Sequence, residues 1–117
     1  MLFLCYPKCT TCQKAKKWLE QNKVTFALRD IKAEQPTLEE LTEWHKKSGL
    51  PLKRFFNTSG LLYKSMGLKD RLPTMNEAEQ LELLSTDGML VKRPILVAED
   101  RVWVGFKEAE WDAVLEK

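Results

Sequence analysis

Residues 2–12 read LFLCYPKCTTC, a short apolar run followed by a Cys-x-x-Cys pair. The apolar run contains residues that favour strands and it stops at Pro7, so it predicts a short buried strand. The pair, Cys9 and Cys12, opens a stretch whose apolar residues recur at helical spacing over about residues 11–22. This order of strand, cysteine pair and helix decides most of what the sequence predicts about the fold.

The rest of the chain predicts three more strands and a block of helices. Residues 24–28 predict a second strand, and a β-α-β order favours two parallel strands joined by the helix. Residues of about 36–91 carry apolar stripes at helical spacing and predict the helical block. Residues 95–98 and 101–104 then predict a hairpin, and residues 107–115 a closing helix. We therefore expect an α/β architecture with a four-stranded mixed sheet.

Local signals mark where the helices of the block begin and end. Thr37 with Glu40, and Asn76 with Glu79, match the capping-box pattern that starts a helix. Gly49 stands where a glycine would end the first of these helices.

Composition bounds the class of protein. The chain has 117 residues, of which 44% are apolar and 31% charged, and we interpret residues 1–117 as one globular domain. The net charge of +2 is too small to argue for nucleic-acid binding, and no apolar run is long enough to span a membrane. The N-terminus lacks the basic region of a signal peptide, so we expect a cytoplasmic location.

The three cysteines all fall within the first twelve residues. No second cysteine pair follows, and the only histidine is His45. A tetrahedral zinc site needs four ligands, so no metal is expected. Redox chemistry is the favoured use of Cys9 and Cys12. Cys5 lies inside the apolar run and is expected to be a small buried hydrophobe. His45 is expected to be a half-exposed helix residue.

The position of Cys9 favours a reactive thiolate. The first turn of a helix has free N–H groups and the positive end of the helix dipole, and Lys8 and further lysines flank the pair. These features predict a pKa of Cys9 below the usual value of about 8.5. Cys12, one turn further on, would then resolve a mixed disulfide on Cys9. Two structural cysteines at a helix start are the alternative.

Four segments of the sequence resemble glutaredoxin-type arsenate reductases and the redox regulators of the Spx/MgsR type. These segments are Tyr6–Cys12, Phe56–Gly60, Lys92–Ile95 and Val104–Phe106. The resemblance covers nearly the whole chain and is strongest to a Cys-x-x-Cys branch of arsenate reductase family proteins. It implies a thioredoxin-like fold, with the helical block inserted between the β-α-β opening and the C-terminal hairpin and helix. It also implies a thiol–disulfide redox protein.

The resemblance assigns expected roles to particular residues. In that family the first cysteine is the nucleophile, which matches Cys9, and Cys12 would be the resolving thiol. An arginine before a cis-proline contacts the active-site anion in the family, which matches Arg93. The positions expected around the bound substrate or anion are Lys8, Thr10, Thr11, Asn57 and Pro94.

The sequence departs from the reductase pattern in ways that bear on the substrate. Thr10 replaces a glycine of the reductases, and Cys12 replaces a serine. Asn57 stands where one further arginine would fall, and Val104–Phe106 lies near the place of another. Fewer cations around the site predict weak binding of a tetrahedral oxyanion, so we expect little arsenate reduction.

Two other functions stay open at this point. One is a redox-switched transcriptional regulator that binds the RNA polymerase α subunit, and Gly49 falls near the glycine used there, although a helix end explains it equally. The other is an inactive thioredoxin-fold binding module. The expected partner is a small thiol or a redox protein, with glutathione, glutaredoxin or thioredoxin as the electron donor. No bound cofactor is expected.

Overall fold

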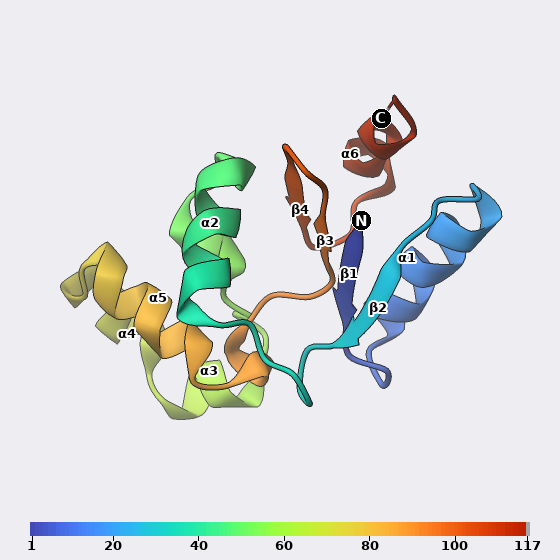
Figure 1. The fold of residues 1–117 in the computed structure, drawn as a ribbon. Coiled ribbons are helices and arrows are strands. Elements are labelled where there is room, and N and C mark those ends of the chain that lie inside the picture. The colour runs from blue at the N-terminus through green and yellow to red at the C-terminus, as the bar shows by residue number, and fades with distance from the viewer. Residues whose placement is uncertain (117) are drawn as a thin grey trace.

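The computed structural model describes residues 1–116, and its centre is a four-stranded mixed sheet (Figure 1). The strands, in their order across the sheet, are β2 (Ala27–Asp30), β1 (Leu2–Cys5), β3 (Ile95–Val97) and β4 (Val102–Val104). β1 runs parallel to β2 and antiparallel to β3, which is antiparallel to β4. The predicted mixed sheet and the helical insert are both confirmed.

Helices cover the two faces of the sheet and divide the core into two clusters. One face carries α1 (Thr10–Gln21) and α6 (Glu108–Trp111), and the other carries the helical block (Figure 1). Successive residues of β1 point to opposite faces, so Phe3 packs in the cluster with α1 and α6 while Leu4 packs in the cluster with the block. Both side chains are fully buried. β3 and β4 likewise contribute residues to both clusters, so the sheet separates the two halves of the core.

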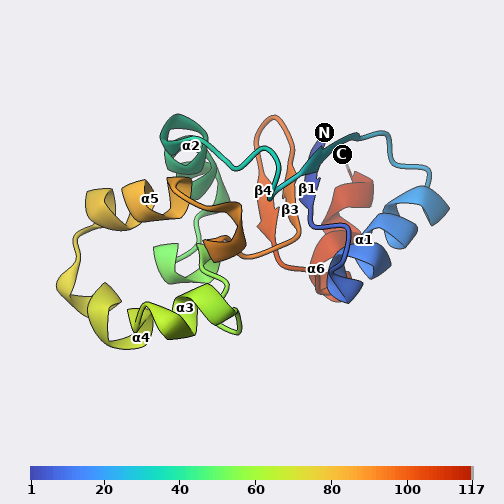
Figure 2. The same cartoon turned by 90° about the horizontal axis from the view of Figure 1, so that it is seen from below.

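The helical block is a set of short helices between β2 and β3 (Figure 2). Its members are α2 (Leu38–Ser48), a 3-10 turn η1 (Leu52–Phe55), α3 (Leu61–Ser65), α4 (Leu68–Arg71), η2 (Leu72–Thr74), α5 (Glu77–Ser85) and η3 (Gly88–Leu90). Thr37 and Asn76 each close a full capping box at the start of α2 and α5, and Gly49 ends α2 with φ of 66°. The local signals in the sequence thus mark real helix ends.

The second strand begins three residues later than predicted. Val24 donates its N–H to the Leu19 carbonyl at 2.9 Å and so is held against the last turn of α1. Pairing with β1 starts where the Ala27 N–H binds the Met1 carbonyl at 2.9 Å. Phe26 instead packs edge-on against Phe3, with ring centroids 5.4 Å apart. Side-chain burial in the core, rather than strand pairing, explains the apolar character of this segment.

The C-terminal elements are shorter than predicted. The Ala98 N–H binds the Arg101 carbonyl at 2.8 Å, so both residues form the hairpin turn and not its strands. The closing helix keeps α geometry only over α6 and continues as a 3-10 helix, η4 (Asp112–Glu116). The four tryptophans are core residues: Trp18, Trp44, Trp103 and Trp111. Among the residues described, no helix combines the length and apolar character needed to cross a bilayer.

Gly88 brings the backbone of η3 against the backbone that follows β2. It is buried, and a Cβ at this position would overlap the carbonyl oxygen of Ile31, directly after β2. We expect Gly88→Ala to lower the free energy of unfolding by about 2–3 kcal/mol, because backbone must move to admit the methyl group. Urea unfolding measures this loss.

Gly49→Ala is the matched control. Gly49 has a left-handed φ, but nothing lies within 4 Å of the added Cβ, so only backbone strain is introduced and the expected loss is about 1 kcal/mol. Equal losses for the two variants would contradict the close approach at Gly88.

Candidate active site

Cys9 is the N-cap residue of α1 and joins that helix to β1. Its backbone is extended, with φ of −89° and ψ of 121°. The Cys9 N–H donates to the Tyr6 carbonyl at 2.9 Å, and the Cys9 carbonyl accepts the Gln13 N–H at 3.1 Å. The half-buried thiol therefore sits at the end of the helix where free N–H groups and the dipole favour negative charge.

Cys12 lies one turn along α1 and is fully buried. Its sulfur accepts the Tyr6 N–H at 3.3 Å, so the same residue, Tyr6, holds both cysteines through its backbone. Cys5 is also buried, at the end of β1. All three cysteines are free thiols in this structure.

The surroundings shift the pKa values of the two thiols of the pair in opposite directions. Burial acts to raise the pKa of Cys9, but hydrogen bonds from the backbone and thiol of Cys12, and from the Arg93 guanidinium, outweigh it and lower that pKa. Burial, together with the hydrogen bond and charge of the neighbouring Cys9, raises the pKa of Cys12 to about 12, although the Tyr6 N–H acts to lower it. Burial likewise raises the pKa of Cys5. At neutral pH, Cys9 is thus the thiol most readily ionised.

Strand register brings Arg93 to this site from 84 positions away in the sequence. Leu4 of β1 pairs with Ile95 of the antiparallel β3, so the chain just before β3 meets the chain just after β1. Arg93 accordingly lies over the ring of Tyr6, with 5.0 Å between the guanidinium carbon and the ring centroid. The Arg93–Pro94 peptide bond is cis, as the family resemblance implies.

The guanidinium of Arg93 is only partly used within the protein. Its Nη1 lies 4.0 Å from the sulfur of Met89. Its Nε is buried and has no hydrogen-bond partner among residues 1–116. Because an unpaired buried N–H is costly, Arg93 keeps one unused hydrogen-bond donor beside Tyr6.

The other predicted site residues divide into two groups. Lys8 precedes the cysteine pair, and Thr10 and Thr11 lie between its two cysteines; all three are exposed. Thr11 lines a cavity of about 690 Å³ that also reaches Arg93. The main influences that lower the pKa of Cys9 are Cys12 and Arg93, not the flanking lysines that we expected. Pro94 is buried, and its carbonyl accepts the Gly105 N–H at 2.8 Å.

Asn57 lies beside the cavity with its side chain turned to the backbone. Its N–H binds the Leu90 carbonyl at 2.8 Å, and its amide nitrogen approaches the Met89 carbonyl at 3.5 Å. These contacts tie the turn after η1 to η3. The neighbouring Thr58 lines the cavity instead.

Sequence reasoning missed four cations of the cavity wall. They are Lys53, Arg54, Lys92 and Lys107. Lys92 lies in one of the segments that carry the family resemblance, and the other three lie within three residues of one, but nothing local in the sequence links any of them to Cys9. The surroundings of Arg93 therefore carry more positive charge than Asn57 and Gly105 led us to expect. Across the described residues, no group of three His, Cys, Asp or Glu side chains is placed to hold a metal ion.

Comparison with known proteins agrees with this arrangement. The family model described as "ArsC family" matches residues 4–114. The chain belongs to the ArsC family. A putative ArsC family related protein from Bacteroides fragilis has a crystal structure that superposes with a TM-score of 0.95 at 56% identity, covering 97% of this chain and 95% of that one.

Two curated relatives of this ArsC-family chain come from Bacillus subtilis. The protein YusI is 50% identical over 112 residues, which is 96% of this chain and 95% of YusI. The regulatory protein MgsR is 33% identical over 110 residues, which is 94% of this chain and 86% of MgsR. Together with the cysteine pair at the start of α1, these likenesses identify a thiol redox protein with a thioredoxin-like fold.

The role of Arg93 in this site is directly testable. We expect Arg93→Ala to raise the pKa of Cys9 and to slow its alkylation at neutral pH by roughly three- to tenfold, because a permanent positive charge and hydrogen-bond donor are lost. The measurement is the rate of iodoacetamide modification at Cys9 against pH, followed by peptide mass spectrometry.

Arg71→Ala, which removes an arginine exposed on α4, is the control and should leave the profile unchanged. If the Arg93→Ala and wild-type profiles coincide, Arg93 does not stabilise the Cys9 thiolate.

Proposed function

We propose that this protein is a thiol–disulfide oxidoreductase in which Cys9 is the attacking thiol and Cys12 the resolving thiol. The observation that supports this most strongly is the opposite displacement of the two pKa values within one helical turn. A low pKa provides thiolate for attack, and a high pKa keeps the second thiol from competing.

The proposed reaction has two exchanges. The Cys9 thiolate attacks one sulfur of a substrate disulfide, and the other substrate sulfur leaves as a thiolate. Cys12 then gives up its proton and attacks the Cys9 sulfur, which releases the first substrate sulfur as a thiolate and leaves a Cys9–Cys12 disulfide. The substrate has been reduced by two electrons, and an external dithiol or two thiols must return them. Glutathione, glutaredoxin or thioredoxin, in a reducing cytoplasm, are the donors we propose.

The environment of Cys12 provides an order for these steps. Besides burial, two influences that raise the pKa of Cys12 come from Cys9: its hydrogen bond and its negative charge. Both vanish once the Cys9 sulfur is bonded to a substrate, whereas the Tyr6 N–H stays to stabilise a Cys12 thiolate. Cys12 therefore becomes a better nucleophile only after the mixed disulfide has formed.

A disulfide is the proposed substrate in preference to arsenate. Cys12 provides a resolving thiol inside the chain, where the arsenate reductases that the sequence resembles have a serine. Asn57, at the place of one of their arginines, is directed to the Met89 carbonyl. We therefore keep arsenate reduction as the weaker activity.

A redox-switched regulator is the second candidate, favoured by the 33% identity to MgsR. In that case the Cys9–Cys12 disulfide would control binding to the RNA polymerase α subunit, and the protein would not turn over. Gly49 does not decide the matter, because its left-handed φ of 66° is what the end of α2 requires. Redox-dependent retention of purified α subunit, without turnover of disulfides, would favour this candidate.

Trapping of the mixed disulfide tests the proposed function. We expect Cys12→Ser to accumulate a covalent adduct of Cys9 with a disulfide substrate, whereas wild-type protein should release the substrate thiol and end as Cys9–Cys12. Intact-mass and peptide mass spectrometry distinguish the two products.

Cys5→Ser should behave like the wild type, because Cys5 is buried in β1 and has no part in either exchange. Release at the wild-type rate from Cys12→Ser, or an adduct at Cys5, would contradict the assignment.

A further inference from the structure

The cavity beside Arg93 has a wall of positive charge that thiol exchange itself does not need. Lys53 and Arg54 come from η1, Lys92 precedes Arg93, and Lys107 precedes α6. None of the residues that line this cavity is acidic. The whole chain has 19 lysines and arginines against 17 acidic residues, so this one-sided lining is a local feature and does not reflect the composition.

Within residues 1–116, the cations of this wall form no ion pair. The ion pairs of the described chain join Arg29 to Glu40, His45 to Glu77 and Lys47 to Glu43, all outside the cavity. Lys53, Arg54 and Lys107 are exposed at their own positions. Unpaired like charges that face one cavity repel each other, and a ligand with several negative charges would relieve that repulsion.

The size and shape of the cavity favour an extended ligand. A volume of about 690 Å³ is far more than one oxyanion fills, and its floor includes the apolar residues Phe56 and Phe106. A second hollow of about 310 Å³ shares Arg54 and Val104 with the first. Charge continues there at Arg101, with one carboxylate, Glu110.

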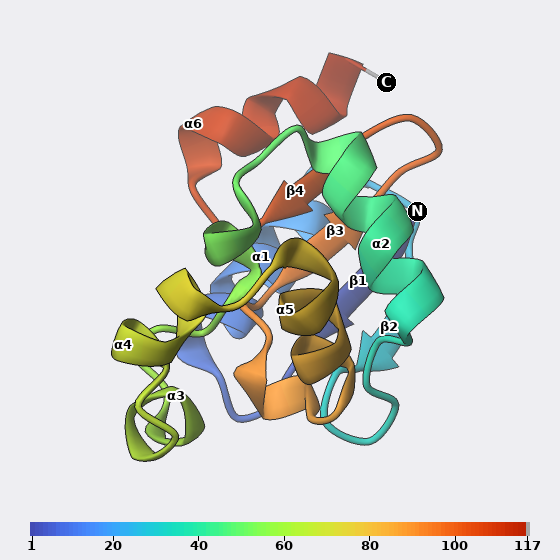
Figure 3. The same cartoon turned by 90° about the vertical axis from the view of Figure 1, so that its left-hand side faces the viewer.

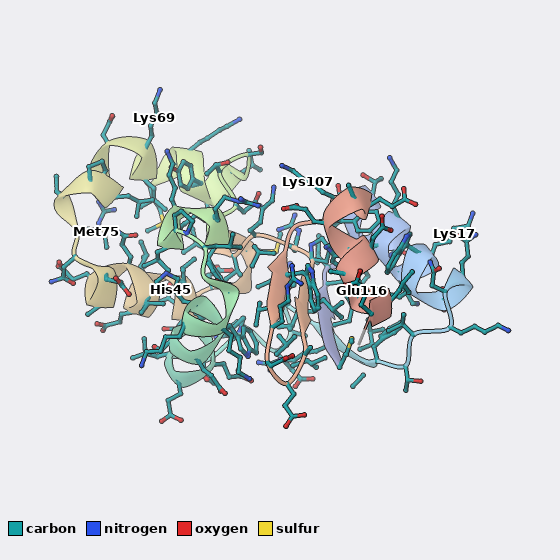
Figure 4. All side chains as sticks on the ribbon, turned by 90° about the horizontal axis from the view of Figure 1, so that it is seen from above. Lys17, His45, Lys69, Met75, Lys107 and Glu116 are labelled. Carbon is teal, nitrogen blue, oxygen red and sulfur yellow. The ribbon has the colours of Figure 1, made fainter. Side chains whose placement is uncertain are left out.

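The two hollows together follow the outer edge of the sheet. β4 is an edge strand, paired only with β3. The chain between α2 and α3 passes beside it (Figure 3). Lys107 lies at the start of α6, on the side toward the helical block, whereas Lys17 lies at the end of the molecule away from that block (Figure 4).

We propose that the two hollows form one groove, which binds an acidic, extended segment of a protein substrate and holds the reactive cysteine of that segment at Cys9. The proposal rests on the proposed function and names its substrate class: protein disulfides flanked by aspartate or glutamate. Carboxylates before or after the substrate cysteine would meet Lys53, Arg54 and Lys107, while apolar parts would cover the half-buried Phe106. The exchange steps are those given above, and the groove adds only binding and orientation.

Model disulfides of defined charge test the proposal. One peptide carries a cysteine as a mixed disulfide with thionitrobenzoate, flanked on each side by two acidic residues. A second replaces each aspartate by asparagine and each glutamate by glutamine, and a third is glutathione in the same mixed disulfide. Stopped-flow absorbance follows release of thionitrobenzoate. We expect the acidic peptide to react about tenfold faster than the neutral peptide at low salt, and the advantage to shrink at high salt.

Two double charge reversals separate the groove from general electrostatics. Lys53→Glu with Lys107→Glu changes two residues of the wall, and Lys14→Glu with Lys17→Glu changes two exposed lysines of α1 outside it. Both alter the net charge equally. The groove variant should lose the preference for the acidic peptide, and the α1 variant should keep it. Equal loss in both variants, or a glutathione disulfide that reacts as fast as the acidic peptide, would overturn the proposal.

A binding measurement distinguishes failure of this proposal from failure of the proposed function. Fluorescence anisotropy of the acidic peptide with serine in place of cysteine needs no exchange chemistry. We expect salt-sensitive binding that the groove variant loses by about tenfold and the α1 variant keeps. If the serine peptide does not bind while neutral disulfides still react at Cys9, the groove proposal is wrong and the oxidoreductase stands. If no disulfide reacts but the serine peptide binds, the oxidoreductase proposal is wrong and the groove still binds acidic segments.

Discussion

Burial of the cysteine pair is the constraint on which the rest of the structure depends. An apolar environment raises the pKa of any thiol, so burial alone would leave both cysteines protonated and unreactive. Only for Cys9 is this effect of burial on the pKa outweighed, by the position at the N-cap of α1, by Cys12 and by Arg93. Cys12 keeps its proton, with a pKa of about 12. Packing thus divides two identical side chains into an attacking and a resolving thiol.

The sheet topology makes this compensation possible. β1 delivers Cys9 to the start of α1, and the antiparallel β3 begins with Arg93 close to the same point, because Leu4 pairs with Ile95. The helical block then packs on the opposite face of the sheet and turns η1, with Lys53 and Arg54, toward Arg93. Three distant parts of the chain meet at one end of β1. A single site with a reactive sulfur and a cationic wall follows from that meeting.

Much of this could be predicted from the sequence, and the limits have physical causes. The capping boxes at Thr37 and Asn76 were readable because a cap depends on side chains three residues apart. The start of β2 could not be predicted in this way, because Phe26 packs on Phe3 and takes no part in strand pairing, although its apolar side chain fits a strand pattern. For the site, Cys9 and Cys12 could be proposed from local spacing alone. Arg93 and its cis-proline needed the family resemblance, and Lys107 needed the folded chain, since nothing local links either residue to Cys9.

The pKa of each cysteine in the reduced wild-type protein tests the central claim most directly. Alkylation of Cys5, Cys9 and Cys12 can be followed separately against pH by mass spectrometry of their peptides, provided that the fold is monitored at alkaline pH. The account predicts that Cys9 is modified first, with a pKa below that of an ordinary cysteine, and that Cys12 stays protected until strongly alkaline pH. Modification of Cys12 at or below the pH at which Cys9 reacts would contradict it.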